Sequence, residues 1–542
     1  YSLFNRFLAV VSTHQIICDC ESTEVHLHTP SILFFPSNKE VAPMKRAAWK
    51  LLLPRLFAVL LIAGFVPFSY SQQKAKLLDS MFAALQAREQ FNGCVLVAEK
   101  GQVIYEKAFG YSDFYSKKKL TTNSLFELAS VSKAFTAMGI MMLKERGLLD
   151  YADEVKKYVP QIPYDGITIR HLLTHTSGLP EYEPLFNQKW DKTRIAANDD
   201  IWTLLEIHKP SVNFKPGEQW RYSNTGYALL ASVIEKVSGV SYGEYLQRNV
   251  FQPLNMERTR VHRRRYQPEP VSDYALGFTF SFAKGGYALP DSIENLKYVY
   301  YLDGIVGDGC VNSTVGDLLK WDRALYTDKL VSKETLEEAF TPATLNTGTA
   351  AQGPGGAGYG FGWVLENSSD GKIAAHGGGW PGYATLIVRL LDRDQTVIML
   401  SNAESGRPDR TVIDILNNRP FSLPRTPAVI ELRQALAHQT MAELSPRIEI
   451  LLRDTATYRF DEGSINVLGY QLMQANRIDD AIDIFKLNVK LYPKSANVYD
   501  SLGEAYMSKG DKELAIANYE KSLQLEPKNK GAVSALKKLK AK

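Results

Sequence analysis

The chain has 542 residues, of which 45% are hydrophobic and 23% are charged, and its formal net charge is +4. This length suggests two or more domains. The near balance of charge gives no indication of nucleic-acid binding, and the short basic run at residues 263–265 is expected to be a solvated loop.

The first 71 residues have the pattern of a leader. Residues 1–43 lack sustained periodicity, and we interpret them as a doubtful upstream extension, with Met44 as the true start. Residues 44–71 combine a basic start, an apolar run and a small-residue end, as in a secretory signal peptide. An uncleaved membrane anchor is the alternative, but prolines and an arginine interrupt the run. We therefore expect an exported protein, periplasmic or secreted, with no stable membrane span after signal cleavage.

Residues 72–424 alternate between helical and strand patterns. A helix is predicted over 74–90 and a hairpin over 94–105. Further strands are predicted over 359–366, 372–376, 383–391 and 396–401, before a closing helix over 409–416. Strands at both ends with helices between them predict an α+β fold, in which helices flank one antiparallel sheet.

The stretch 129–143 predicts a buried helix, because Thr136 is the one polar residue between Ala134 and Leu143. Ser130 and Lys133 are expected in its first turn, on one face. A partly desolvated lysine beside a serine hydroxyl can act as a base. The alternative is a capping serine with a snorkelling lysine. The pattern S-x-x-K occurs six times, but only the copy at Ser130 opens a long apolar helix.

Two later motifs carry further polar groups. Tyr222-Ser223-Asn224 precedes an apolar helix; the phenolate of a tyrosine near a lysine can accept a proton, and an asparagine can hold a substrate amide. His376-Gly377-Gly378-Gly379 is expected at a strand end, where glycines let a ligand approach the backbone. Taken alone, each motif is also compatible with an ordinary loop.

Together, S-V-S-K, Y-S-N and H-G-G resemble the ordered motifs of the serine β-lactamase and penicillin-binding-protein superfamily, in its class C-like branch. The stretches 171–180 and 307–318 are also similar to that family, and the resemblance covers about residues 75–420. It implies a set of roles: Ser130 as the nucleophile; Lys133 and Tyr222 as the proton-transfer pair; Asn224, His376 and Gly378 in substrate binding; and the amides of Ser130 and Gly379 as the oxyanion hole.

The implied reaction is acyl transfer to water through an acyl-enzyme on Ser130, with small esters, D-amino-acid peptides, related amides or β-lactam-like molecules as substrates. No metal or organic cofactor is implied. His376 stands where some relatives carry lysine, and a mostly neutral histidine predicts that β-lactams are poor substrates. The alternative is a catalytically weak or silent penicillin-binding-like protein whose C-terminal repeats bind a protein partner.

Four other residues are ambiguous. His171 and His175 have an i, i+4 spacing that suits a metal, but no third ligand is apparent, and we interpret them as structural. Cys94 and Cys310 lack metal-site spacing. We expect two buried free thiols, although the sequence leaves a disulfide open.

Residues 425–542 predict an all-α tetratricopeptide-repeat region. The segments 466–493 and 500–527 match with a 34-residue period, in which Gly469 corresponds to Gly503. These glycines are expected at the start of the first helix of each repeat, and residues 425–460 are candidates for a degenerate unit. The region is either a helical cap that stabilises the hydrolase or a groove that binds a partner.

Overall fold

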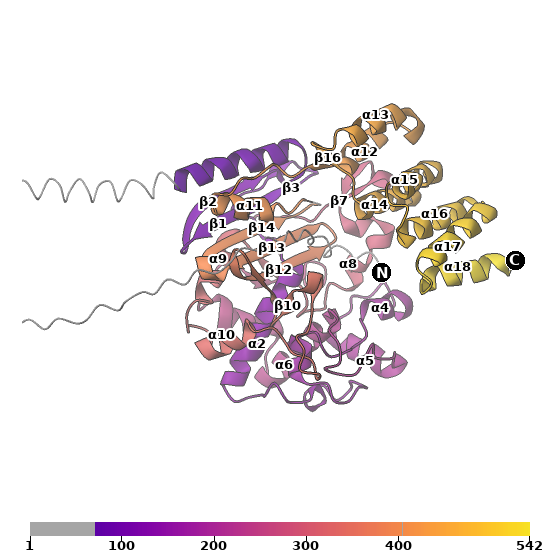
Figure 1. Ribbon diagram of the computed structural model, residues 1–542. Coiled ribbons are helices and arrows are strands. Elements are labelled where there is room, and N and C mark those ends of the chain that lie inside the picture. Colours follow the sequence, from indigo (N-terminus) through magenta and orange to yellow (C-terminus); the bar gives the residue numbers. More distant parts are fainter. Residues whose placement is uncertain (1–70, 404, 542) are drawn as a thin grey trace, which may run out of the picture.

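The computed structural model describes residues 71–403 and 405–541 (Figure 1). The predicted upstream extension and, apart from Ser71, the predicted signal peptide lie outside the described residues. Within the described ranges, every helix is too short or too polar to span a bilayer. The first described helix covers residues 71–87, where the sequence predicts one over 74–90.

A seven-stranded antiparallel sheet forms the centre of the first part of the chain. Strands from both ends of this part meet in the sheet, because β1 pairs with β14 and places Leu96 opposite Ile398. The antiparallel sheet predicted from the sequence is therefore confirmed. In spatial order its strands are β10 (Gly358–Tyr359), β11 (Val364–Ser368), β12 (Gly371–Trp380), β13 (Tyr383–Leu390), β14 (Gln395–Ser401), β1 (Gly93–Glu99) and β2 (Gln102–Phe109).

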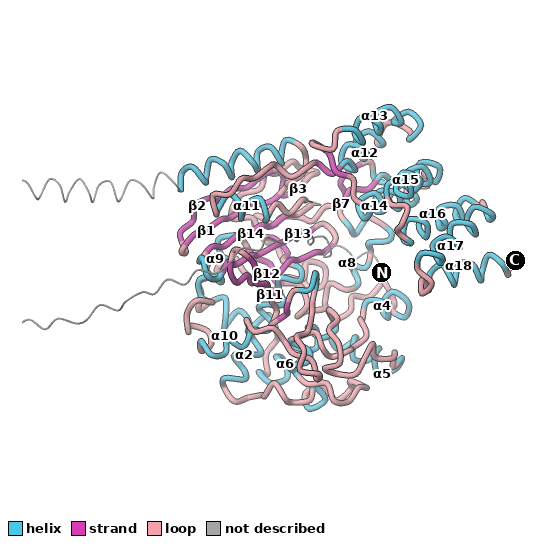
Figure 2. Tube along the Cα trace, in the orientation of Figure 1, coloured by secondary structure: helices cyan, strands magenta, loops and turns pink. Residues whose placement is uncertain are grey.

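Helices cover both faces of this sheet (Figures 1 and 2). Side chains alternate between the faces of a strand, and β1 follows this rule. Val95 and Val97 join a core with the helix 71–87 and α11 (Asp409–Leu416). Leu96 joins the larger core on the other face, where the side chains of α2 lie. A strand buried on both faces explains the continuous apolar run in this part of the sequence.

Two strand predictions need correction. The strand predicted over 359–366 is divided into β10 and β11, because Gly362 has a positive φ of 78° and a Cβ at Gly360 would lie 2.1 Å from the Ala339 carbonyl oxygen. The glycine run after His376 does not end a strand. It lies inside β12, where Gly379 pairs with Ala384 of β13.

The second face of the sheet carries most of the helices. They are α2 (Ser132–Glu145), α3 (Ile169–Leu173), α4 (Glu183–Lys189), α5 (Asn198–His208), α6 (Asn224–Ser238), α7 (Tyr242–Leu246), α8 (Tyr298–Tyr301), α9 (Val315–Ala324) and α10 (Lys333–Ala339). Small sheets connect them: β3 (Tyr111–Asp113) with β4 (Lys118–Lys119), β5 (Phe126–Glu127) with β9 (Val311–Ser313) and β6 (Arg260–Val261), and β7 (Thr279–Ser281) with β8 (Gly286–Ala288).

The C-terminal part is helical and has its own core. The helices α14 and α16 begin 34 residues apart, as do α15 and α17. Gly469 and Gly503 lie within α14 and α16 rather than at their starts, because the rings of Phe485 and Tyr519 pack against them. The elements are β15 (Thr426–Pro427), α12 (Ala428–Leu436), α13 (Met441–Arg453), β16 (Tyr458–Arg459), α14 (Glu462–Gln474), α15 (Ile478–Leu491), α16 (Ala496–Lys509), α17 (Lys512–Leu525) and α18 (Lys530–Lys540).

The helical part packs against the β7–β8 hairpin of the first part (Figure 1). Phe282 contacts the core of the repeats. The guanidinium of Arg477 lies 5.6 Å from the centre of the Phe282 ring, and that of Arg433 lies 4.9 Å from the centre of the Phe280 ring. Gln471 donates a hydrogen bond to the carbonyl oxygen of Phe280. The repeats are therefore docked onto the β-lactamase-like part through a defined aromatic contact.

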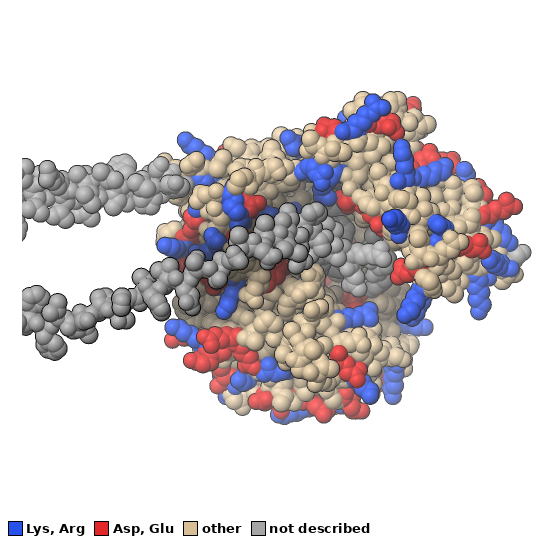
Figure 3. All heavy atoms as spheres, viewed as in Figure 1, with Lys and Arg blue, Asp and Glu red and all other residues tan. Residues whose placement is uncertain are grey.

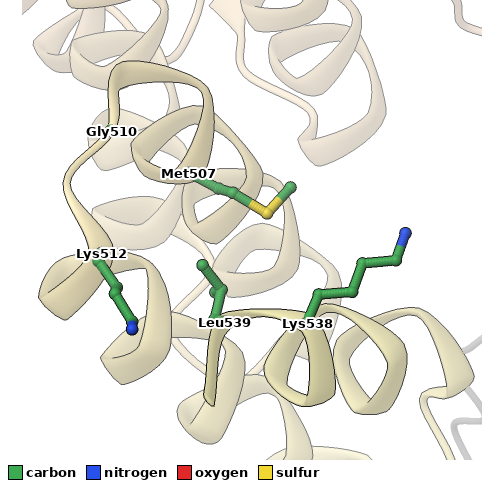
Figure 4. Close-up of a pocket in the computed structure, with 5 residues that line it drawn as sticks. All are labelled: Met507, Gly510, Lys512, Lys538 and Leu539. Atoms are coloured by element: carbon green, nitrogen blue, oxygen red, sulfur yellow. The ribbon is translucent and has the colours of Figure 1, made fainter. Parts of the chain in front are cut away.

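The described surface carries both signs of charge. Lys and Arg side chains are interspersed with Asp and Glu over the face drawn in Figure 3. The described cysteines, Cys94 and Cys310, are free, as expected; Cys94 is buried and Cys310 is half-buried. A small pocket among the repeats lies between the α16–α17 turn and the end of α18 (Figure 4). It is lined by Met507, Gly510, Lys512, Lys538 and Leu539.

Candidate active site

Ser130 lies in a 3-10 turn, Ala129–Val131, directly before α2, and not within the helix as the sequence predicts. The turn is held by the small sheet around β9, because the Leu128 amide donates to the carbonyl oxygen of Val311. The hydroxyl of Ser132 accepts a bond from the Val311 amide and is fully buried. Ser130 is half-buried. The two serines thus differ: the hydroxyl of Ser132 is used to support the turn, and Ser130 remains partly accessible.

Lys133 is fully buried in the first turn of α2. Its Nζ lies 3.3 Å from Oγ of Ser130, 2.8 Å from Oδ1 of Asn224 and 2.8 Å from the carbonyl oxygen of Asp308. A lysine ammonium has three N–H donors, and these three oxygens match them. Nζ also lies 4.9 Å from the centre of the Tyr222 ring. The structure therefore brings together the predicted nucleophile, both members of the predicted proton-transfer pair and the predicted amide-binding asparagine.

The start of α6 positions the Y-S-N motif. Ser223 is the N-cap of this helix, and its hydroxyl accepts a hydrogen bond from the Gly226 amide, which fixes the chain direction where Tyr222 and Asn224 leave the loop. Asn224 donates through Nδ2 to Oε1 of Glu183 at 2.8 Å and accepts through Oδ1 from Lys133. Its side-chain amide thus connects Lys133 to Glu183.

Two carboxyl groups beside Asn224 were not anticipated from the sequence. Glu181 accepts a bond from the Asn224 backbone amide at 2.9 Å, and Glu183 accepts from its side chain. Burial raises the pKa of Glu181, and burial together with the neighbouring Glu181 charge raises the pKa of Glu183 to about 8. Both glutamates follow directly after the family-like stretch 171–180, which was the available signal.

Strand β12 passes directly against the Ser130 turn. A Cβ on Gly378 would lie 2.1 Å from the Leu128 carbonyl oxygen and 2.2 Å from Oγ1 of Thr385, so the close approach requires glycine. Thr385 donates to the same Leu128 carbonyl at 2.6 Å. The pairing of β12 with β11 ends at Ala375, before the glycines. Gly379 therefore lies on a strand segment beside the turn that carries Ser130, and its part in an oxyanion hole stays a prediction.

His376 is buried and uses both ring nitrogens within the protein. Nδ1 donates to the carbonyl oxygen of Gly377 at 2.8 Å, and Nε2 accepts from the hydroxyl of Tyr359 at 3.0 Å. Burial and the nearby Lys133 charge lower the pKa of His376 to about 3, so the imidazole is neutral. The neutral state agrees with the expectation from the sequence. Its proposed contact with substrate stays a prediction.

Arg407 is a third residue that the sequence did not single out. Its Nη2 donates to the carbonyl oxygen of Gly378 at 2.8 Å, and the partial burial of its guanidinium lowers the pKa of Arg407. The residue lies in the loop before α11, where nothing in the local pattern marks it. It places a permanent positive charge beside the β12 strand, next to the neutral His376.

Neither histidine of the 171–180 stretch is arranged as a metal ligand. Nδ1 of His171 accepts a bond from the Thr168 amide, and Nδ1 of His175 accepts one from the Ser223 amide. Among the described residues, no group of three or more His, Cys, Asp or Glu is arranged to hold a metal ion. This geometry is consistent with a structural interpretation of both residues.

The comparisons with known proteins agree with this geometry. Residues 78–418 match the Beta-lactamase family model, and residues 496–529 match the tetratricopeptide repeat model. Penicillin-binding protein 4* of Bacillus subtilis (strain 168) is 47% identical over 363 residues, which cover 66% of this chain and 79% of that protein. A solved octameric penicillin-binding protein homologue from Pyrococcus abyssi is 28% identical, with a TM-score of 0.54, and the match covers 64% of this chain and 77% of that one.

A more distant structure supports the fold alone. The D-amino acid amidase of Ochrobactrum anthropi SV3, solved with D-phenylalanine, is 23% identical with a TM-score of 0.52, over 65% of this chain and 98% of that one. The family model covers more than half of the chain, and its range contains all of the motif residues. The chain belongs to the β-lactamase family, with penicillin-binding proteins among its relatives and a tetratricopeptide repeat near its C-terminal end.

Proposed function

We propose that this protein is a serine hydrolase that acts through an acyl-enzyme on Ser130. The observation that carries the proposal is the position of Lys133, whose Nζ lies within hydrogen-bond reach of Ser130 and beside the Tyr222 ring. A serine becomes a nucleophile only when a neighbouring group accepts its proton. The half-buried Ser130 has Lys133 within reach, Tyr222 lies beside that lysine, and Ser132 is committed to the backbone.

The proposed reaction has two halves. Oγ of Ser130 attacks the substrate carbonyl carbon while its proton passes to the Lys133–Tyr222 pair, and the carbonyl oxygen becomes an oxyanion held by the amides of Ser130 and Gly379. The carbon–heteroatom bond then breaks, and the leaving group takes the proton. A water molecule attacks the acyl-enzyme in the same way, giving a carboxylic acid and free Ser130.

We propose small esters, D-amino-acid peptides or related amides as substrates, with β-lactams turned over poorly. A neutral His376 lacks the charge that a lysine at its position would offer to a carboxylate. Arg407 supplies a cation on the other side of Gly378 and supports the inclusion of carboxylate-ended peptides. The relationship to a penicillin-binding protein supports acylation of Ser130 by penicillins, which need not lead to rapid release.

The proposal includes export, which rests on the leader pattern of residues 44–71. A substrate panel tests the reaction. p-Nitrophenyl butyrate, a D-alanyl peptide and a chromogenic cephalosporin would be compared on one preparation, with Ser130→Ala as the blank. We expect the ester or the peptide to have the highest kcat/KM. Turnover equal to that of Ser130→Ala for all three substrates would favour the alternative, a catalytically silent binding protein.

A further inference from the structure

His175 is buried behind the catalytic tyrosine, with 1% of its surface exposed. Its ring centre lies 4.4 Å from that of Tyr222. Its Nδ1 accepts a hydrogen bond from the amide of Ser223 at 3.1 Å, and its own carbonyl oxygen accepts one from the amide of Arg221 at 2.9 Å. The residues on both sides of Tyr222 are therefore attached to one histidine, through its ring and through its backbone.

The backbone around His175 extends this attachment. The carbonyl oxygen of Thr176 accepts a bond from the Gly217 amide, and that of Gly178 accepts one from the Asn213 amide, both at 2.8 Å. His175 itself has a φ of 60°, in the left-handed region that is uncommon for residues other than glycine, although histidine is found there more often than most. A strained residue persists only where its surroundings hold it in place. Here the strain turns the His175 carbonyl and ring toward the same short loop.

The chemistry of the ring suits a fixed acceptor rather than a proton carrier. The rings of Trp220, Tyr227 and Tyr359 lie within 5.8 Å of the imidazole centre. Burial, with the charge of Lys133, holds the pKa of His175 well below its usual value. Because Nδ1 accepts the Ser223 amide, the proton of the neutral ring belongs on Nε2, which is buried and has no hydrogen-bond partner among the described residues.

We propose that His175 is a positioning residue of the hydrolase, which acts through Tyr222 and Asn224 without touching the substrate. Its Nδ1 satisfies the Ser223 amide, which would otherwise be buried without a partner just before the first turn of α6. Together with the N-cap bond of Ser223, this bond helps to set where the tyrosine and the asparagine leave the loop relative to Lys133. The inference rests on the proposed function, since it assigns a role in orienting that site.

Two variants of the full chain test whether His175 acts through the hydrogen-bond acceptor Nδ1 or through the packing of its aromatic ring. His175→Asn keeps an acceptor close to the position of Nδ1, and asparagine tolerates a positive φ. His175→Phe keeps an aromatic ring and loses the acceptor. His171→Asn, in the same motif but bonded to Thr168, is the matched control. The readouts are the thermal unfolding midpoint, kcat and KM for p-nitrophenyl butyrate, and the rate at which a fluorophosphonate labels Ser130.

We expect His175→Phe to lower kcat and the labelling rate by about 10- to 100-fold with KM changed less than about threefold, because a misplaced catalytic group costs about that much. We expect His175→Asn to stay within about fivefold of the wild type and to keep the same pH profile. The His171→Asn control should match the wild type.

A folded His175→Asn that is as inactive as His175→Phe, or that loses one limb of the pH profile, would overturn the positioning role, because it would assign the ring a direct part in proton transfer. Wild-type activity in His175→Phe would overturn it as well. If His175→Phe does not fold, the activity and pH profile of His175→Asn still test the positioning role. If the wild type is not labelled at Ser130, the proposed function is wrong. That result is distinct from the results that would contradict the positioning role of His175.

Discussion

Nζ of Lys133 lies 2.8 Å from Oδ1 of Asn224, closer than its 3.3 Å distance to Oγ of Ser130. The lysine therefore connects the nucleophile turn to the first residue of α6. With the Asp308 carbonyl oxygen as the third partner, the three acceptors surround a compact ammonium group. This arrangement matches a compact ammonium better than the fork of a planar guanidinium.

Lys133→Arg is expected to be folded and nearly inactive. The guanidinium cannot give up its proton at working pH, and its fork does not match three acceptors around one nitrogen. We expect kcat for ester hydrolysis to fall by at least about 1,000-fold, on the scale of losing a proton-transfer group. Lys144→Arg, at the polar end of the same helix, should retain wild-type activity. An active Lys133→Arg enzyme would exclude lysine as a proton acceptor.

Glu183 gives the fold a stability that depends on pH. Its folded-state pKa is raised to about 8, so between about pH 4.5 and pH 8 the folded carboxyl holds a proton that the unfolded chain has released. The contribution of Glu183 to the free energy of unfolding is therefore highest at low pH and declines as the pH rises through this window. In Glu183→Gln, we expect the difference in unfolding midpoint between pH 5.5 and pH 8.5 to shrink.

The exposed Glu206→Gln should leave that difference unchanged. The measurement is thermal unfolding of the three proteins at both pH values. Identical pH responses of the wild type and Glu183→Gln would show that Glu183 ionises normally in the folded protein.

The preference of the enzyme between substrates should not change with pH between pH 5.5 and pH 8 through any titration of His376. Its pKa is lowered to about 3, so the ring stays neutral throughout this range and its charge does not change. We expect the ratio of kcat/KM for a cephalosporin to that for p-nitrophenyl butyrate to stay constant in the wild type and in His376→Gln. In His376→Lys the ratio should rise by about tenfold, because a charge-assisted bond becomes available.

A wild-type ratio that climbs as the pH falls toward 5.5 would mean that His376 gains a proton in the working range. An unchanged ratio in a folded His376→Lys protein would remove this position from carboxylate recognition.

The contact of Phe282 with the repeats favours a stabilising cap over a free partner-binding module. Phe282→Ala should lower the unfolding midpoint, because truncating a packed phenylalanine costs about 3–5 kcal/mol in a fully buried site and less in a half-buried one. The exposed Phe421→Ala is the matched control and should have little effect. A chain ending at residue 424 should be less soluble than the full chain, since it exposes Phe280 and Phe282. If the shortened chain has the same unfolding midpoint and solubility as the full chain, the repeats do not act as a stabilising cap.

The periodicity of strands allowed the sheet to be predicted, and the motif spacing allowed the proximity of Ser130 and Lys133 to be predicted, because each depends on local pattern. The strand β12 was predicted too short, since a run of three glycines is typical of a turn. It continues through Gly379 because Gly378 packs closely against the carbonyl oxygen of Leu128. Leu128 is far from Gly378 in the sequence. Long-range contacts of this kind leave no periodic signal.

The missed residues of the site have the same origin. Glu183 begins the short helix α4 and Arg407 lies in the loop before α11, and only the fold brings the first to Asn224 and the second to Gly378. The sequence led us to interpret His175 as structural, but it gave no sign of the bond to the Ser223 amide, which depends on a left-handed backbone at His175. Glycines 469 and 503 were placed at helix starts, although ring packing puts them in the middle of helices.

Covalent labelling of Ser130 tests the central claim most directly. The wild type, Ser130→Ala and Ser132→Ala would each be treated with a fluorophosphonate probe, and the modified peptide would be identified by mass spectrometry. We expect one adduct on Ser130 in the wild type, the same adduct in a folded Ser132→Ala protein, and none in Ser130→Ala, which should also lose ester turnover by several orders of magnitude. Labelling of Ser132, or ester turnover in Ser130→Ala at the wild-type rate, would contradict the account.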